Sequence, residues 1–312
     1  MSCGELWRNK LAESKETTPK EHRAGYVALI GRPNAGKSTL LNRLLGFELS
    51  RVNRKPQTTR HRILGILTET NYQIVFLDTP GFLDPRNKLQ ESMVQTVKRT
   101  AAEADIVLIL ADVTRPIMKT LQFFEKNRLS QPCLLALTKA DLIRKDQLLP
   151  IIGTAQGTEL FSAILPVSAL RNEGVDALLN EILRRLPEHP PYFPGDVLTD
   201  QPERFFVAEI IRENILRYFS QEIPYAAHVE IEEFKERPGR KDYISAVILV
   251  EKKSQKQIVI GKNGAAIKKI GEMSRKEIEQ FLGRPVFLNL FVKVMADWRQ
   301  NERKLKEFGY RQ

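Results

Sequence analysis

Between residues 24 and 189, short apolar runs alternate with longer stretches in which apolar residues recur at helical spacing. Several of the runs are apolar at almost every position, which indicates strands that are buried on both faces. They cover residues 26–30, 61–67, 72–78, 105–112, 133–138 and 161–168. Because helical stretches separate these strands, the pattern predicts an α/β domain that is doubly wound around a largely parallel sheet.

A cluster of prolines interrupts this pattern, and residues 190–202 are predicted to form an extended linker that permits two domain arrangements. Beyond the linker, the pattern predicts a smaller α+β domain over residues 203–312, with the order α-β-β-α-α-β and a charged helix at the end. The expected elements are helix 203–219, strands 226–234 and 243–251, a short helix ending near residue 260, helix 264–282 and strand 284–294. Residues 1–23 carry no apolar core or cleavage site, and we expect a flexible extension there.

Composition excludes several classes of protein. With 42% hydrophobic and 28% charged residues among 312, the chain has enough apolar material for packed cores and is not expected to be disordered. No run approaches the roughly 18 apolar residues that a membrane-spanning helix needs. The two cysteines, Cys3 and Cys133, cannot build a disulfide framework or a multi-cysteine metal site, which favours a cytoplasmic location.

The charge of the chain is +11 and is unevenly distributed. Residues 252–312 carry 15 basic and 6 acidic side chains, whereas residues 196–251 carry 7 basic and 12 acidic ones. A basic C-terminal region fits a polyanionic partner such as nucleic acid. It fits a merely solvated basic face equally well, so charge alone leaves both interpretations open.

A phosphate-binding loop is predicted where the strand at 26–30 runs into the sequence GRPNAGKST and then a helical pattern. This is GxxxxGKS in the strand-loop-helix context that the motif requires. Gly31 and Gly36 let the backbone fold around an anion, Lys37 can reach the β- and γ-phosphates, and the Ser38 hydroxyl can ligate Mg²⁺. The residues predicted to contact the nucleotide here are Gly31, Asn34, Ala35, Gly36, Lys37, Ser38 and Thr39.

Three further segments follow strands and specify the nucleotide. Asp78-Thr79-Pro80-Gly81 ends a buried strand, where Asp78 can hold the Mg²⁺ shell and the Gly81 N–H can contact a γ-phosphate, although DTPG alone is as typical of an ordinary turn. In Thr138-Lys139-Ala140-Asp141, the Asp141 carboxylate can accept hydrogen bonds from N1–H and the 2-amino group of guanine, which adenine lacks. The backbone N–H groups of Ser168-Ala169-Leu170 can meet the guanine 6-oxo group.

This ordered set resembles the TRAFAC class of GTPases, and GRPNAGKST with DTPGF resembles its bacterial branch, which includes the Era family. The resemblance implies that residues 50–62 form the first switch, in which Thr59 would bind Mg²⁺ and the γ-phosphate. Ser38 and Thr59 would then be the metal ligands, with Asp78 in the second shell, and Lys37, Thr59 and Gly81 would be the catalytic residues.

Two positions depart from the pattern of related GTPases. The third motif usually begins with Asn, whose amide braces the guanine pocket and the phosphate loop, and Thr138 can replace only part of that bracing. Weaker nucleotide affinity is therefore expected. Phe82 stands near the position at which other GTPases carry a catalytic glutamine, and it cannot orient water by hydrogen bonding. Unaided hydrolysis should therefore be slow and rely on other groups, a bound cation or a partner.

An RNA-binding turn is predicted in the second domain, where Gly261-Lys262-Asn263-Gly264 joins two helices. Such a turn lets a nucleic acid backbone approach, with Lys262 and Lys268 near phosphates. GxxG alone is weak, since glycine pairs punctuate many helix-helix turns, but with the order α-β-β-α-α-β it resembles a type II KH domain. The aromatic residues Trp298, Phe308 and Tyr310 are predicted to pack the last helix rather than to stack on bases.

An N-terminal P-loop GTPase domain followed by one KH domain is the order found in the Era family, and the match spans nearly the whole chain. It implies a cytoplasmic, monomeric GTPase that uses GTP/GDP and Mg²⁺. It further implies binding to the 3′ end of 16S rRNA in the 30S ribosomal subunit, assistance to 30S maturation, and peripheral contact with the cytoplasmic face of the cell membrane. Two alternatives are a membrane-surface signalling GTPase and a GTP-dependent RNA-modification protein. The first lacks a CaaX box, and the second lacks a candidate nucleophile outside the nucleotide pocket.

Overall fold

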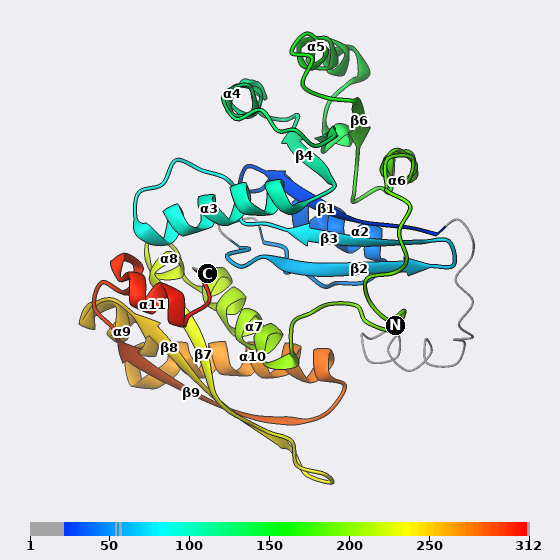
Figure 1. Ribbon diagram of the computed structural model, residues 1–312. Helices are drawn as coiled ribbons and strands as arrows, with labels where there is room; N and C mark the ends of the chain where they lie inside the picture. The colour runs from blue at the N-terminus through cyan, green and yellow to red at the C-terminus, as the bar shows by residue number, and fades with distance from the viewer. Residues whose placement is uncertain (1–21, 54, 56–57, 311–312) are drawn as a thin grey trace. The chain divides into compact units, whose positions relative to one another are not determined.

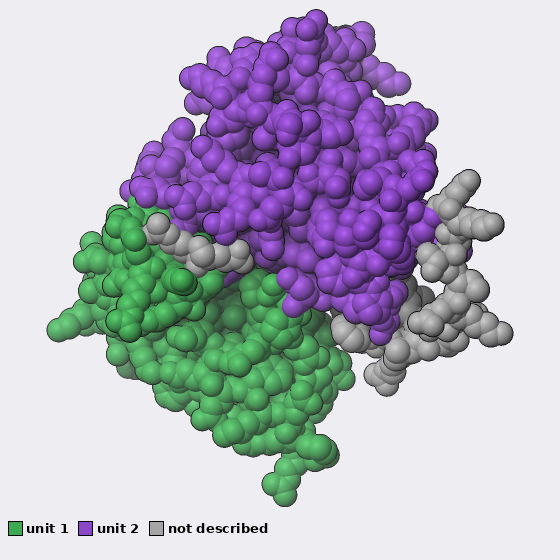
Figure 2. Space-filling model, viewed as in Figure 1, with its two compact units in different colours: residues 1–13, 87–89, 201–312 green, residues 14–86, 90–200 purple. Residues whose placement is uncertain are grey.

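The computed structural model describes residues 22–53, 55 and 58–310. These fall into two compact units, which Figure 2 colours separately: the larger takes in 22–86 and 90–200, and the smaller takes in 201–310 together with 87–89. The predicted flexible extension, residues 1–23, lies almost wholly outside the described residues. None of the described helices is long and apolar enough to span a membrane.

The larger unit contains a six-stranded sheet in the order β2-β3-β1-β4-β5-β6 (Figure 1). The strands are β1 (Arg23–Gly31), β2 (Ile63–Glu69), β3 (Tyr72–Asp78), β4 (Ile106–Asp112), β5 (Cys133–Thr138) and β6 (Ala163–Val167). All neighbours pair in parallel except β2 and β3. These two are antiparallel because only Thr70 and Asn71 separate them, and so short a turn cannot cross over. The doubly wound α/β prediction is confirmed.

Helices cover both faces of this sheet. They are α2 (Lys37–Leu45), α3 (Lys88–Glu103), α4 (Met118–Lys126), α5 (Lys145–Gln156) and α6 (Val175–Leu183), with a short 3₁₀ turn at Ala140–Leu142. Residues of α3, α4 and α5 join the core on one face, and α2 and α6 pack against strands on the other. Burial on both faces explains why β4 and β5 are apolar along almost their whole length.

The strand register brings the chemically interesting ends of the strands to one edge. Leu29 pairs with Asp78, Gly31 pairs with Leu110, and Asp112 pairs with Thr138. The carboxyl ends of the parallel strands β1, β3, β4 and β5 therefore meet, and the loops that follow them converge there. The phosphate loop follows β1, the Asp78 motif follows β3 and the Thr138 motif follows β5, while the Ser168 motif follows the neighbouring parallel strand β6.

The proline-rich segment is extended, as predicted, but most of it is fastened to the larger unit. The Gln73 side chain accepts hydrogen bonds from the N–H groups of Tyr192 and Phe193 and donates to the Phe193 carbonyl at 2.8 Å. The Ile66 N–H donates to the carbonyl of Leu198, whose side chain is buried. Within the predicted linker 190–202, the stretch up to residue 198 is therefore anchored to the larger unit, because β2 and β3 offer polar partners along it.

The smaller unit has a three-stranded sheet, β7-β8-β9, in which β7 and β8 are antiparallel and β8 and β9 are parallel. Its elements are α7 (Glu203–Tyr218), α8 (Ile223–Ala226), β7 (His228–Lys235), β8 (Asp242–Val250), α9 (Lys253–Ile260), α10 (Ala265–Leu282), β9 (Val286–Val294) and α11 (Glu302–Glu307), with 3₁₀ turns at Lys262–Gly264 and Trp298–Gln300. Helices α7 and α10 share a core with β8. The turn α8 was not predicted, and β7 starts two residues later than expected because this turn, which has Pro224 as its second residue, extends to Ala226.

The aromatic residues near the C-terminus pack within this unit, as predicted. Trp298 is fully buried, and its indole N–H donates to the Ala226 carbonyl at 2.9 Å. The Tyr310 hydroxyl lies 2.9 Å from Nδ1 of His228, and the Phe308 ring stacks on the same imidazole. These rings are therefore part of the protein core.

Candidate functional site

The phosphate loop has the backbone geometry of an anion cradle. Asn34 and Gly36 both have positive φ, at 65° and 89°, so the loop turns sharply just before α2 begins at Lys37. The Lys37 ammonium is buried and donates to the carbonyl oxygens of Gly31 and Arg32 at 3.2 and 3.3 Å. Burial lowers the pKa of Lys37, although the Asp78 carboxylate opposes this shift. A phosphate group would compensate the cost of burying this charge.

Both backbone polar groups of Ala35 make hydrogen bonds within the protein. The Ala35 N–H donates to the Arg32 carbonyl at 3.1 Å, so this amide closes the loop rather than pointing freely at a ligand. The Ala35 carbonyl in turn accepts from the hydroxyl of Thr138 at 2.8 Å. Ala35 therefore holds the cradle in shape.

The second motif lies directly against the phosphate loop. A Cβ atom on Gly81 would come within 2.7 Å of the backbone nitrogen of Pro33, so only glycine allows this approach. The Thr79 hydroxyl donates to the Leu29 carbonyl at 2.7 Å, which fastens Thr79-Pro80-Gly81 to β1. Thr79 thus positions the turn, and its side chain is not available to a nucleotide.

Three predicted metal-site side chains meet between this turn and α2. The Ser38 hydroxyl lies 3.1 Å from that of Thr59 and donates to Oδ2 of Asp78 at 3.0 Å. Asp78 is fully buried and its Oδ1 makes no hydrogen bond among the described residues, although the hydroxyls of Ser50 and Thr59 are near enough to lower its pKa. Burial outweighs these groups and Lys37, and it raises the pKa of Asp78. Two hydroxyls beside a buried carboxylate fit Mg²⁺, which prefers oxygen ligands.

The surroundings of Asp78 predict that removing its charge has opposite effects on the stability of the protein and on metal binding. Because the folded-state pKa of Asp78 is raised, its contribution to stability is present below the unfolded pKa and is lost as the pH rises through the folded pKa. Above its unfolded pKa, Asp78 thus costs the nucleotide-free protein stability. We expect Asp78→Asn to leave the melting temperature of that form unchanged or higher, and to weaken GTP binding in Mg²⁺ by about tenfold or more.

Calorimetry with and without EDTA, together with thermal melting, tests this expectation. Asp146→Asn is the matched control, because Asp146 is exposed and pairs only with Arg144 among the described contacts. If Mg²⁺ strengthened GTP binding to Asp78→Asn as much as to the unsubstituted protein, Asp78 would have no role at the metal.

The guanine end of the site is built from the loops after β5 and β6. Asp141 is largely buried, and one of its carboxylate oxygens lies 3.6 Å from the Arg171 guanidinium. Lys139 has a positive φ of 60° and donates to Asp112 at 2.6 Å. Burial alone would raise the pKa of Asp112, but the hydrogen bonds from Lys139 and Thr114 hold it below its ordinary value. A fixed Lys139 stem and the Asp141 carboxylate therefore frame the base position.

Thr138 braces the site through one hydroxyl. It donates to the Ala35 carbonyl at 2.8 Å and lies 3.2 Å from the Ala111 carbonyl. The link between β5 and the phosphate loop therefore exists without the asparagine that is usual in related GTPases. One hydroxyl hydrogen must serve both carbonyls, so the expectation of weaker bracing and weaker affinity stays a prediction.

The loop that is predicted to meet the 6-oxo group is closed by a backbone bridge. The Ser168 N–H donates to the Glu173 carbonyl at 2.9 Å, and the Glu173 N–H donates back at 3.0 Å. Ser168 therefore cannot donate its N–H to guanine, and that part of the prediction is wrong. The N–H groups of Ala169 and Leu170 remain the predicted contacts of the guanine 6-oxo group.

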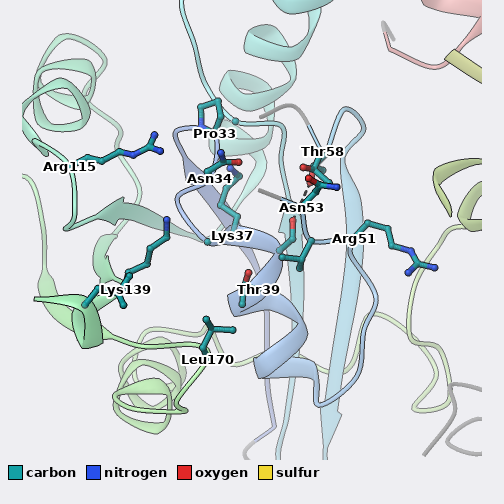
Figure 3. Close-up of a pocket in the computed structure, with 16 residues that line it drawn as sticks. Pro33, Asn34, Lys37, Thr39, Arg51, Asn53, Thr58, Arg115, Lys139 and Leu170 are labelled. Carbon is teal, nitrogen blue, oxygen red and sulfur yellow. Dashed lines mark hydrogen bonds between the residues drawn. The ribbon is translucent and has the colours of Figure 1, made fainter. Parts of the chain in front are cut away.

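These groups surround a pocket of about 630 Å³ at the start of α2 (Figure 3). Lys139 and Leu170 lie on one side of the helix start, and Arg51, Asn53 and Thr58 lie on the other. Val52, Asn53 and Thr58, which also line the pocket, were predicted only as part of the first switch, and Arg115 and Leu142 were not predicted at all. Only the convergence of the loops brings these side chains together. Residues 54 and 56–57 of the predicted first switch lie outside the described residues.

Phe82 does not take part in the pocket. Its side chain is buried in the core and stacks on Phe123, with ring centroids 4.4 Å apart, and it meets Phe124 edge-on. The side chain that replaces the glutamine of other GTPases is therefore structural.

In the smaller unit, the predicted RNA-binding turn opens beside a groove. Gly261 has φ 74°, and a Cβ there would come within 2.7 Å of Ala266 Cβ, so this glycine allows the close packing of the turn. Gly264 has φ 76° but faces open space. The adjoining groove of about 380 Å³ lies between α10 and β9, and Lys268, the predicted RNA contact, is among its lining residues. It can hold bases beside a phosphate backbone at the turn.

Most of the residues that line this groove were not predicted. Its lining also includes Gly271, Glu272 and Arg275 of α10 and Leu288 and Leu290 of β9. Gly271 was detectable, because a glycine inside a helix costs stability and lies one turn after Ile267 on the same face. Its missing side chain leaves only Leu290 Cδ1 nearby, at 3.6 Å from where a Cβ would stand.

Comparison with known proteins agrees with both halves. A family described as "50S ribosome-binding GTPase" matches residues 26–139, and a "KH domain" family matches residues 222–299. GTPase Era of Syntrophus aciditrophicus is 45% identical over 92% of this chain and 95% of its own length. GTPase Era of Geotalea uraniireducens is 46% identical over 94% of this chain and 99% of its own.

Two solved structures are similar over 93% of this chain and 100% of their own chains, each with a TM-score of 0.88. One, at 38% identity, is a variant of Aquifex aeolicus Era bound to GDP and AlF₄⁻. The other, at 40% identity, is Era in complex with MgGDPNP and nucleotides 1506–1542 of 16S ribosomal RNA. With this identity to curated relatives over nearly its whole length, and with both domains in the same order, the chain belongs to the Era family of GTPases.

Proposed function

We propose that this GTPase is a nucleotide-controlled switch that binds the 3′ end of 16S rRNA and assists maturation of the 30S ribosomal subunit. It acts in the cytoplasm as a monomer, with GTP or GDP and Mg²⁺ in the larger unit and RNA in the smaller one.

The observation that carries this proposal is the groove between α10 and β9 at the Gly261–Gly264 turn. It joins an apolar floor of Leu288 and Leu290 to the cations Lys268 and Arg275. Unstacked bases bind such floors, while cations and a glycine turn accept the backbone, so the groove suits single-stranded RNA. A relative of 40% identity was solved with a fragment of 16S rRNA, which supports this choice of RNA.

The proposed control by nucleotide follows from the contacts among the predicted metal-site side chains Ser38, Thr59 and Asp78. Thr59 reaches Ser38 through its hydroxyl, and it belongs to the predicted first switch. Mg²⁺ and a γ-phosphate would hold Thr59 in place, and loss of the γ-phosphate would release it. GTP and GDP would then stabilise different arrangements of this segment, which is the requirement for a switch.

The proposal predicts that RNA affinity depends on the bound nucleotide. Linkage between two sites typically changes affinity by about 5- to 150-fold. We expect a difference in this range between the states bound to non-hydrolysable GTP and to GDP. Fluorescence anisotropy with a single-stranded RNA from the 3′ end of 16S rRNA, at fixed salt, measures it. Equal affinity in the two states would refute the switch while leaving RNA binding intact.

Sedimentation separates the proposal from its alternatives. The protein should pellet with 30S particles, and anionic lipid vesicles in parallel tubes test the peripheral membrane contact. Pelleting with vesicles alone would favour a membrane-surface GTPase. Burial raises the pKa of Cys133 to about 11, so this thiol stays protonated at neutral pH and does not favour an RNA-modification enzyme.

A further inference from the structure

Arg43 of α2 makes two hydrogen bonds to the loop Ser168–Leu170, which is predicted to meet the guanine 6-oxo group. Nε of Arg43 donates to the Ala169 carbonyl at 2.8 Å, and an Nη nitrogen donates to the Leu170 carbonyl at 3.1 Å. We propose that Arg43 is a positioning residue for guanine recognition, acting through these two carbonyl groups. The proposal requires that the chain binds guanine nucleotides through this loop, and it is independent of RNA binding.

The two carbonyls that Arg43 binds belong to the peptide groups at the tip of the loop, one of which carries the Leu170 N–H that is predicted to meet guanine. A peptide group is planar, so fixing the Ala169 carbonyl also fixes the direction of the Leu170 N–H. The Leu170 carbonyl shares a peptide with the Arg171 N–H, which donates to the Ser168 hydroxyl at 3.2 Å. Ser168 and Glu173 close the base of the loop through their backbone bridge. Arg43 holds the exposed tip, which that bridge does not reach.

Charge adds to orientation. A guanidinium that binds a carbonyl polarises the whole peptide group, which makes the N–H of that peptide a better donor. The Leu170 N–H would therefore bind the partly negative 6-oxo oxygen more strongly with Arg43 present. Both contacts are exposed to solvent, so the effect should be modest rather than decisive.

The helix that carries Arg43 also carries the phosphate site. Helix α2 starts with Lys37 and Ser38, and Arg43 lies in its last turn, where a cation is favoured. Buried side chains of Leu40, Leu41 and Leu44 fix the helix in the structure. One rigid helix therefore sets the distance between the phosphate cradle and the loop that is predicted to meet guanine. Figure 3 shows Leu170 of this loop beside the helix. A guanine nucleotide must match that distance at both ends.

The test compares nucleotides that differ only at the base. GDP and IDP both carry a 6-oxo oxygen, whereas 6-thio-GDP replaces it with sulfur, a weak acceptor, and keeps N1–H and the 2-amino group. We expect Arg43→Ala to weaken GDP and IDP binding by about 3- to 10-fold each, and 6-thio-GDP binding by less than about twofold. Arg43→Lys should recover part of the loss, since one ammonium can reach only one carbonyl well.

Titration calorimetry on the full chain provides these affinities, with thermal melting of each nucleotide-free variant as a check on folding. Arg144→Ala is the control, because Arg144 is exposed and pairs with Asp146, outside the pocket. Equal losses for GDP and 6-thio-GDP would overturn the proposal, because Arg43 would then only support the fold. Unchanged GDP affinity would overturn it as well. If the unsubstituted protein bound GDP and 6-thio-GDP equally, the loop would not read the 6-oxo group and the proposal would fail at its premise.

Discussion

Replacing Lys37 by alanine should weaken GTP and GDP binding by about 10- to 100-fold. Lys37 carries the full positive charge inside the phosphate cradle, where its ammonium touches the carbonyls of Gly31 and Arg32 and is shielded from water. A charge-assisted contact with phosphate in such a site is worth about 1.5–3 kcal/mol or more, which is about one to two powers of ten in affinity. Calorimetry with each nucleotide in Mg²⁺ measures the loss.

The same substitution should not unfold the protein. Burial lowers the pKa of Lys37, so its charge costs free energy in the nucleotide-free state, and its removal should be tolerated. Lys119→Ala is the matched control, because it removes the same charge from the exposed surface of α4. Nucleotide affinity that stayed the same in Lys37→Ala would show that GxxxxGKS is not the phosphate site here.

The residues that sequence predicted well are those whose chemistry needs a fixed spacing. A phosphate cradle needs glycines and a lysine at set positions before a helix, so the sequence predicts Gly31 to Lys37 without any knowledge of packing. Buried parallel strands are apolar throughout, so the sheet could be predicted too. The antiparallel pairing of β2 was implicit in the two-residue turn at Thr70 and Asn71.

The residues that sequence could not predict act through tertiary contacts. In the sequence, Arg43 looks like an ordinary surface residue of a helix. Nothing in the neighbouring residues predicts its hydrogen bonds to the carbonyls of Ala169 and Leu170, which lie 126 and 127 residues away. The Ser168 N–H looks free until the bridge to Glu173 is seen. Residues 190–198 have the composition of a linker, yet their backbone finds partners in Gln73 of β3 and Ile66 of β2. Composition reports local preference, whereas these partners depend on the fold.

Replacing Gly264 by aspartate should lower RNA affinity by more than about tenfold in both nucleotide states, while leaving GTP binding unchanged. The position suits the test because a Cβ there meets nothing within 4 Å. Its φ of 76° is in a region that aspartate and asparagine tolerate better than most residues. An aspartate would place a negative charge at the turn where an RNA phosphate must approach.

Two matched variants separate charge from shape. Gly264→Asn adds a side chain of nearly the same size without charge, so it should lose less RNA affinity than Gly264→Asp. The difference in RNA affinity between the two variants should become smaller at high salt, because salt screens the charge. Gly239→Asp puts the same residue at another open position of positive φ, in the hairpin between β7 and β8, and should bind RNA normally. Anisotropy titrations of the four proteins at two salt concentrations give the comparison. If Gly264→Asp bound RNA as well as Gly239→Asp, the turn from Gly261 to Gly264 would not contact the RNA backbone, and the groove between α10 and β9 would lose its assignment.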